Sequence, residues 1–180
     1  MRRRTALGIM AAATAAVAAG QGLALAAEDA GSQLTSLIKK DHETVKKLFS
    51  QAAKSGAAPA DRQALFQKLR LELLPHMQGE EQSLYQVMAQ KQAVREDALL
   101  GEEEHHAAQA IMMELVNMQP GDDRYLAKLK VLKESLEHHI EEEENSILPK
   151  ARKALSSQEM QQVLAGFQER KQQARQALQA

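Results

Sequence analysis

Hydrophobic residues recur at steps of three and four along most of the chain, which is the spacing of one face of an α-helix. A first stripe starts at Leu34 and ends at a Gly-Ala-Ala-Pro break over residues 56–59, and others cover about 61–88, 95–118 and 123–149. Ser156 and Glu159 form a capping-box pattern that opens a shorter helix over residues 156–178. Long helices joined by short loops predict an all-α, up-down-up-down four-helix bundle with a short C-terminal fifth helix.

The composition supports a helical chain and excludes several kinds of site. Aromatic residues make up only 3% of the 180 residues and Trp is absent, which disfavours a β-sandwich or a β-barrel. The sequence contains no Cys, which excludes disulfides, thiolate metal sites and cysteine nucleophiles. The formal net charge of −1 gives no support to nucleic-acid binding, so we expect no nucleic-acid partner.

The N-terminus has the pattern of a signal peptide. Basic residues at positions 2–4 precede an Ala-rich apolar stretch over 5–20, and small residues at 24 and 26 fit a cleavage site. We predict removal of residues 1–26, which leaves a mature domain of residues 27–180 in the bacterial periplasm or outside the cell, without stable membrane insertion. Arg3 and Arg4 resemble a twin-arginine signal, but an ordinary secretory signal fits equally well.

Four of the six histidines form two pairs with identical spacing. The interval between the two members is the same in both pairs, a Glu stands at the fourth position after each second member, and an acidic residue precedes each first member. The repeated set is His42, His76 and Glu80 in one copy and His105, His139 and Glu143 in the other. Every position recurs at one fixed interval along the chain, so the sequence contains two copies of one helical hairpin that carries metal-ligand residue types.

These six residues continue the hydrophobic stripes, so they are predicted to face the core of the bundle. A rise of about 1.5 Å per residue up and down each hairpin places all of them at one height. Two carboxylates in a core are costly without a partner, and no Lys or Arg lies on the stripes at that height. A bound cation is the natural compensation. We therefore predict a site for two metal ions with three of these ligands each.

Five further residues flank the predicted ligands. Glu81 and Glu144 follow the two carboxylates, and we expect them to be solvated or to hydrogen-bond a ligand. His106 and His138 are about 100° off the stripes and are expected to be exposed or to lie behind the ligands, with ligation in place of a neighbour as the alternative. Tyr85 is expected to pack in the bundle, with a role at the centre as a hydrogen-bond or radical partner as the alternative.

The order His, His-x-x-x-Glu, His, His-x-x-x-Glu resembles the hemerythrin-like HHE cation-binding family. The similarity covers roughly residues 32–150. The resemblance implies a non-haem centre of two iron ions, each held by the His and Glu of one hairpin, with Glu80 and Glu143 as candidates to bridge. The oxygen-carrying hemerythrins have a further His and an Asp at the places of Gln109 and Glu143, so this site is richer in carboxylate.

Nitrogen and oxygen ligands without thiolate suit iron, with manganese as the alternative. We expect an exported protein that binds a small diatomic ligand, O2 or NO, or peroxide at a di-iron site. Two other functions stay open: a di-iron enzyme that consumes peroxide or oxidises a small substrate, and a helical bundle in which the metal has only a structural role. We favour metal and small-ligand binding over a dedicated enzyme as the description of the molecule, although the carboxylate-rich ligand set argues against a pure oxygen carrier and leaves a more redox-active site open.

Overall fold

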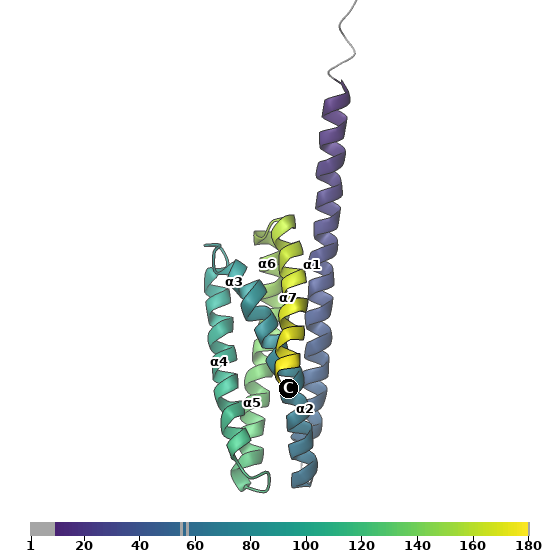
Figure 1. Cartoon of the computed structure of the whole chain (residues 1–180). Helices are drawn as coiled ribbons and strands as arrows, with labels where there is room; N and C mark the ends of the chain where they lie inside the picture. Colours follow the sequence, from purple (N-terminus) through teal and green to yellow (C-terminus); the bar gives the residue numbers. More distant parts are fainter. Residues whose placement is uncertain (1–9, 55, 57, 180) are drawn as a thin grey trace, which may run out of the picture.

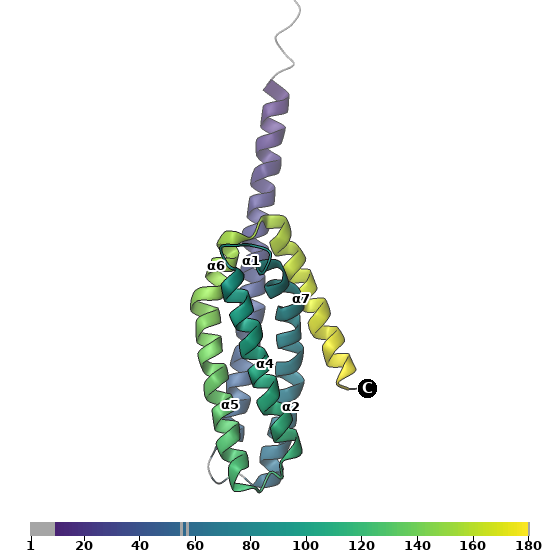
Figure 2. The same ribbon diagram turned by 90° about the vertical axis from the view of Figure 1, so that its left-hand side faces the viewer.

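The computed structural model of the protein describes the backbone of residues 10–54, 56 and 58–179, and the side chains from residue 30 onward in those ranges. Four long helices lie side by side: α1 (Met10–Ala52), α2 (Pro59–Gly79), α4 (Arg95–Asn117) and α5 (Asp123–Glu142). Figures 1 and 2 show successive helices running in opposite directions, with α7 (Ser157–Ala177) along the outside. No strand occurs in the described ranges, so the predicted all-helical fold with a C-terminal helix is confirmed.

Two of the helices continue through a wider, π-helical turn. α2 passes into η1 (Glu80–Tyr85) and α3 (Gln86–Met88), and α5 passes into η2 (Glu143–Ile147) and α6 (Leu148–Ala154). The two π-helical segments stand at repeat-related positions, because Glu80 opens the first and Glu143 opens the second. Such segments are rare and occur frequently at functional sites. In both halves the irregular turn therefore begins at a predicted carboxylate ligand.

Most predicted helix ends agree with the structure, but the first helix begins at Met10, well before the hydrophobic stripe that starts at Leu34, and the end near Pro149 also differs. α2 starts with Pro59, at a position where the missing backbone N–H costs nothing. The capping box of Ser156 and Glu159 is present at the start of α7. The prediction that the fourth helix ends near Pro149 is wrong, because helical structure continues to residue 154. Pro149 lies in the first turn of α6, directly after the π-helical segment, where a proline is tolerated.

Two apolar clusters fill the bundle, one on each side of the predicted ligands. One includes Ile38, Leu84, Ile147 and Phe167, and the other includes Val45, Leu73, Ala108 and Leu136. On α1, for example, His42 lies between Ile38 of the first cluster and Val45 of the second. The histidines and glutamates therefore form a polar layer between two hydrophobic ones.

α7 covers one side of the bundle only. It packs against α1, α2 and η1, and the Phe167 ring lies edge-on to the ring of His76 with a centroid distance of 6.0 Å. A Cβ atom at Gly79 would come within 2.9 Å of the Phe167 ring, so the close approach of α7 requires glycine there. Lys171 of α7 forms an ion pair with Asp41 of α1. The C-terminal helix thus reaches the surroundings of the predicted site.

The predicted signal peptide is only partly covered by the structure. Residues 1–9 lie outside the described residues, and α1 is helical from Met10. The predicted cleavage after residue 26 falls within α1 and stays a prediction. Among the described residues, no helix combines the length and apolarity needed to cross a membrane.

Candidate metal centre

All six predicted ligands are buried in one layer of the bundle. They come from α1, from α2 with η1, from α4, and from α5 with η2, and none is more than 3% exposed. The rings of His42 and His76 meet edge to face with centroids 4.9 Å apart, and those of His105 and His139 meet at 4.7 Å. The structure therefore brings the predicted set together, with one histidine pair in each hairpin.

In the first hairpin, the histidine Nε2 atoms face the two carboxylates. His42 Nε2 lies 3.2 Å from Glu143 Oε2, and His76 Nε2 lies 3.2 Å from Glu80 Oε1. One ligand atom from each of these four residues fits within a span of 4.8 Å, which is a group that could hold a metal ion. The carboxylate of Glu143 belongs to the other hairpin, so this group joins both halves of the chain.

An outer carboxylate holds each histidine by its other ring nitrogen. From Nδ1 to the carboxylate oxygen, the pairs are His42 with Glu144 at 2.9 Å, His105 with Glu81 at 3.0 Å, His76 with Asp41 at 3.1 Å, and His139 with Glu104 at 2.7 Å. The pairs obey the internal repeat, so both halves have the same outer hydrogen bonds. Because an ionised carboxylate only accepts, each Nδ1–H donates, which leaves Nε2 as the lone-pair nitrogen that a metal needs.

In the second hairpin, two such nitrogens face each other. His105 Nε2 and His139 Nε2 are 3.0 Å apart, and two lone pairs at this distance repel unless a proton or a metal ion lies between them. Burial lowers the pKa of His139, but the hydrogen bond to Glu104 and the charge of Glu143 outweigh it and raise the pKa above its ordinary value. The raised pKa favours a proton on His139, and such a proton would relieve the repulsion when no metal is bound.

The two central carboxylates have opposite electrostatic surroundings. Burial raises the pKa of Glu80 well above its ordinary value, and the neighbouring charge of Glu143 raises it further. Burial acts on Glu143 in the same direction, but the contact with His42 and the charge of His139 outweigh it, so the pKa of Glu143 is lowered. Two carboxylates this close resist ionising together, and Glu80 is the one that keeps its proton without a cation.

Buried polar atoms without partners show that these residues fit a metal ion. His42 Nε2, both carboxylate oxygens of Glu80 and Oε2 of Glu143 are fully buried, and none has a hydrogen-bond partner among the described residues. Neither Glu80 nor Glu143 forms an ion pair with a Lys or Arg whose side chain is described. Unsatisfied carboxylates in a protein interior are costly, and a cation ligated by the facing nitrogens and oxygens would satisfy them.

Comparison with known protein families agrees with this geometry. The hemerythrin HHE cation-binding domain matches residues 33–151. The chain belongs to this family. No curated protein and no solved structure matches the chain. Membership of a cation-binding family and a buried His/Glu cluster that is compatible with metal binding support the same assignment.

Four acidic residues of this HHE domain hydrogen-bond the buried histidines, and this role was predicted for two of them. Glu81 and Glu144 hydrogen-bond histidines that are predicted ligands, which is one of the two roles expected for them. Asp41 and Glu104 have the same role, which was not predicted for them. Their signal was present in the sequence, since an acidic residue precedes the first histidine of each copy.

The two remaining histidines lie outside the buried set. The side chain of His106 is 60% exposed and that of His138 is 68% exposed, in line with their positions off the stripes. His138 stands with Glu104 and Glu142 in a second group of potential ligands that is only partly buried. Exposed acidic groups of this kind are common without a metal, so the buried layer is the stronger candidate.

Tyr85 makes the two halves of the HHE domain unequal. It is fully buried, and its hydroxyl donates a hydrogen bond to Glu143 Oε1 at 3.0 Å. Its ring centroid lies 5.4 Å from that of His105. Burial raises the pKa of Tyr85 well above its ordinary value, so the hydroxyl keeps the proton that it donates. Tyr85 therefore both packs in the core and contacts a predicted ligand, which combines the two alternatives considered for it.

A glycine makes room for the ring of this tyrosine, at a position where the other half of the repeat has a large side chain. Beneath its ring lies Gly101, where a Cβ atom would come within 2.9 Å of two ring carbons. The residues related by the repeat are Leu148 in place of Tyr85 and Ile38 in place of Gly101. One half thus pairs Tyr with Gly where the other pairs Leu with Ile. The hydroxyl donor exists in one copy of the hairpin only.

Proposed function

We propose that this chain is an exported non-haem di-iron protein that binds O2, NO or peroxide. One observation carries the proposal: four histidine Nε2 atoms and two carboxylates converge in a buried layer, without a cationic side chain from the described residues. Nitrogen and oxygen donors without thiolate match the preferences of iron, with manganese as the alternative. Similar carboxylate and histidine sets occur in the cores of other di-iron helical bundles.

The contacts support a division of the ligands between two ions. His42 and His76 would serve one ion, and His105 and His139 the other, since each pair already meets ring to ring. Glu80 faces histidines of both hairpins, at 3.2 Å from His76 Nε2 and 3.6 Å from His105 Nε2. That position makes Glu80 the better candidate to bridge the two ions.

The surrounding residues prepare the site for a small oxidant. Two ferrous ions, when bound, supply one electron each and coordination positions that six protein ligands leave open. The outer carboxylates orient the imidazoles, and the apolar clusters on both sides limit the access of water. Tyr85 holds a proton at Glu143 Oε1, on one of the two carboxylates that would hold the metal ions.

Metal analysis of the purified protein tests the di-iron assignment. We expect about two irons per chain, the stoichiometry of di-iron bundles. The double variant His105→Ala with Glu143→Ala should lose most of this iron, whereas His106→Ala with Glu142→Ala, which changes the exposed neighbours of the same residues, should keep it. Iron well below two per chain, or equal iron in both variants, would contradict the proposal.

Reaction with oxidants separates binding from catalysis. A stable and reversible oxygenated spectrum of the reduced protein indicates a binding protein. Many turnovers of peroxide indicate a di-iron enzyme, and the buried hydroxyl of Tyr85 at Glu143 is the observation that favours this second function. Copurification of zinc alone, with a higher melting temperature as the sole effect, would leave only a structural metal.

Export is a separate part of the proposal. It is supported by the basic residues at positions 2–4, the apolar stretch that follows, and the small residues before position 27. Cell fractionation and N-terminal sequencing test it. We expect a mature N-terminus near residue 27 in the exported fraction, and an intact N-terminus in the cytoplasm would refute it.

A further inference from the structure

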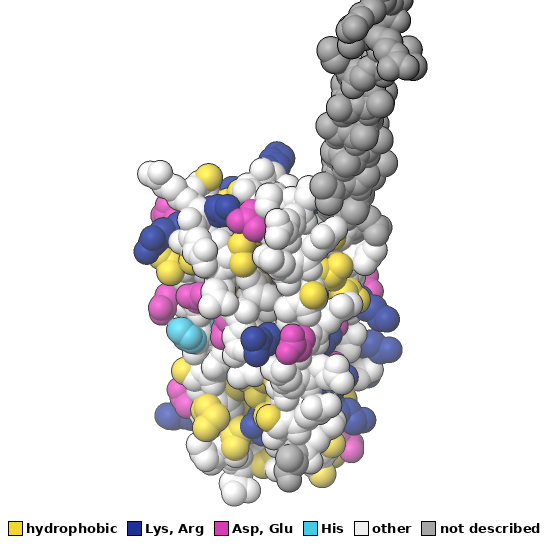
Figure 3. Space-filling model, turned by 45° about the horizontal axis from the view of Figure 1, so that its top comes forward, with side chains coloured by type: hydrophobic (Ala, Val, Ile, Leu, Met, Phe, Trp, Pro, Cys, Tyr) yellow, Lys and Arg dark blue, Asp and Glu magenta, His cyan; other side chains and the backbone are white. Residues whose placement is uncertain are grey.

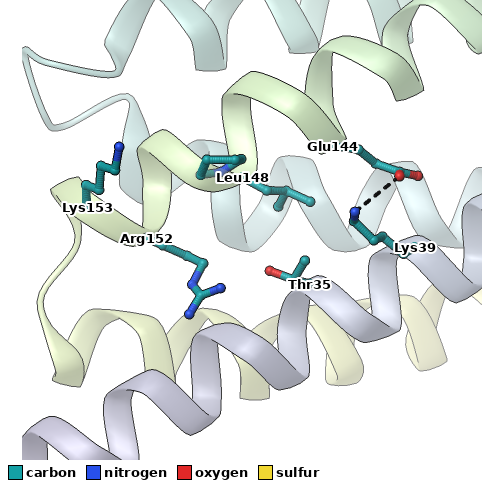
Figure 4. A pocket seen from close by; sticks show the side chains of 7 residues that line it. Thr35, Lys39, Glu144, Leu148, Arg152 and Lys153 are labelled. Atoms are coloured by element: carbon teal, nitrogen blue, oxygen red, sulfur yellow. Dashed lines mark ion pairs between the residues drawn. The ribbon is translucent and has the colours of Figure 1, made fainter.

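A surface groove lies between α1 and α6, beside the metal centre. It has a volume of about 530 Å³, and its walls include Thr35, Lys39, Glu144, Leu148, Arg152 and Lys153. Figure 4 shows Thr35 between Lys39 and the guanidinium group of Arg152, with Leu148 across from them. The groove thus combines cationic groups and a hydroxyl with an apolar wall.

Positive charge exceeds negative charge in this groove. Three basic side chains line it against the single carboxylate of Glu144, although the whole chain has a net charge of −1. Lys39 Nζ lies 3.4 Å from Glu144 Oε2, whereas Arg152 and Lys153 form no ion pair with a residue whose side chain is described. Basic and acidic side chains are intermixed on the face seen in Figure 3. A concave surface with an excess of one charge attracts ligands of the opposite charge.

The internal repeat supplies a second groove for comparison. Its volume is about 500 Å³, and Glu81, Gln82, Gln86, Ala89, Glu102 and Arg170 line it. Glu102 corresponds to Lys39 and Ala89 corresponds to Arg152, at the interval of the repeat in each case. Glu81 likewise corresponds to Glu144. The repeat has therefore kept the hollow and the carboxylate, while the repeat-related cations are present in one copy only.

The cationic groove is connected to the metal centre through one residue. Glu144 Oε1 accepts the hydrogen bond from His42 Nδ1 at 2.9 Å, and the other oxygen of the same carboxylate faces Lys39. An anion that pairs with Lys39 would draw the ammonium group away from Glu144 and strengthen the bond of that carboxylate to His42. Occupation of the groove would therefore change the surroundings of one half of the centre only.

We propose that this groove binds a small oxyanion, a phosphate or a carboxylate group, beside the His42 half of the metal centre. The guanidinium of Arg152 can bind two oxygens of such a group at once, and the two lysines add point charges. The wall formed by Leu148 suits an apolar part of the same ligand. Residues of α1, η2 and α6 form the groove without any bound metal, so binding goes beyond the proposed O2, NO or peroxide chemistry and does not depend on it.

Calorimetric titration of the metal-loaded protein tests this proposal. Inorganic phosphate and acetate are titrated separately, at constant ionic strength maintained with chloride, because salt screens exposed charges. We expect saturable binding of a single anion per chain. Tighter binding of phosphate assigns a phosphate-bearing ligand, and tighter binding of acetate assigns a carboxylate. Absence of saturable binding of either anion would overturn the proposal.

Matched variants separate the groove from general surface charge. Lys39→Gln with Arg152→Gln should weaken binding about tenfold or more, since it removes two charge-assisted hydrogen bonds. Arg170→Gln with Lys68→Gln removes the same charge from the second groove and from the exposed face of α2, and should leave binding unchanged. Equal weakening in both double variants would refute a specific site. Circular dichroism confirms that these exposed substitutions leave the helices intact.

Transfer of the cations to the second groove is a gain-of-function test. Ala89→Arg with Glu102→Lys reproduces the charges of Arg152 and Lys39 at repeat-related positions, and it should raise the number of bound anions from one to two. In the metal-loaded protein, the anion should also shift the optical spectrum of the centre, and Lys39→Gln should abolish this shift. A full shift in Lys39→Gln would contradict the connection through Glu144. If the purified protein contains no iron but binds the anion normally, only the di-iron function is refuted and the anion site stands.

Discussion

Replacing Glu80 by Leu should stabilise the metal-free protein while it removes metal binding. Both carboxylate oxygens of Glu80 are fully buried and have no hydrogen-bond partner among the described residues. An unsatisfied buried polar group costs about 1–3 kcal/mol, and burial of a Leu side chain contributes roughly 1.5–3 kcal/mol. After allowance for imperfect packing, we expect the free energy of unfolding to rise by about 2–4 kcal/mol, or roughly 5–15 °C in Tm for a chain of this size.

With metal bound, the unchanged protein should become more stable than the Glu80→Leu variant. An ion that binds only the folded state stabilises it by about 2.7 kcal/mol at a free concentration one hundred times its Kd, and the variant should lose most of this gain. Thermal unfolding is followed by circular dichroism after chelation and again with ferrous iron under anaerobic conditions. Glu142→Leu, a change of the same kind at a partly exposed position, should alter the metal-free protein by only about 0.5 kcal/mol. A destabilised metal-free Glu80→Leu protein, or one that keeps the full metal-dependent rise, would refute the reasoning.

Three further predictions concern pH, the tyrosine and its glycine. Burial lowers the pKa of His76 from its ordinary value of 6.5 to about 4. Between pH 4 and pH 6.5, the unfolded chain therefore binds a proton at His76 that the folded chain does not. Metal-free stability should therefore rise from pH 4 to 6.5 by up to roughly 3 kcal/mol from this group, and His76→Gln should flatten that part of a urea-unfolding profile. Tyr85→Phe should weaken iron binding about tenfold in a competition titration, whereas Tyr125→Phe, at the other tyrosine of the chain, should not; equal effects would exclude a role for the hydrogen bond. Gly101→Ala should cost about 1–3 kcal/mol because its Cβ atom would meet the Tyr85 ring, and an unchanged Tm would show that the ring has room to move.

The residues of the candidate site could be found in the sequence because repetition and helical spacing act together. His42 recurs as His105 at the same interval that separates the two glutamates, and all of these residues lie on hydrophobic stripes. The stripe determines which side of a helix is buried, and the rise per residue determines height along the bundle. Both quantities follow from the chain alone, which is why the six residues meet in one layer.

The hydrogen bonds between these histidines and acidic residues on neighbouring helices could not be predicted from the sequence in the same way. Asp41 accepts from His76 of α2, and Glu104 accepts from His139 of α5, although each acid stands directly before a different histidine. Such a bond depends on the rotation of one helix against its neighbour. Hydrophobic spacing limits that rotation only to the width of a stripe, about 100°. The π-helical segments and the passage of helical structure through Pro149 also depend on packing in the assembled bundle.

By itself, the sequence determined the helices, the duplicated hairpin and the six inward-facing histidines and glutamates, because these depend on periodicity and residue type. Only the tertiary structure decided which contacts the residues that differ between the two copies make. It placed Tyr85 on Glu143 above a glycine, and it placed Lys39 and Arg152 in one groove while the related groove holds Glu102 and Ala89. These contacts join helices far apart in the chain, where a few ångströms of register decide which side chains meet.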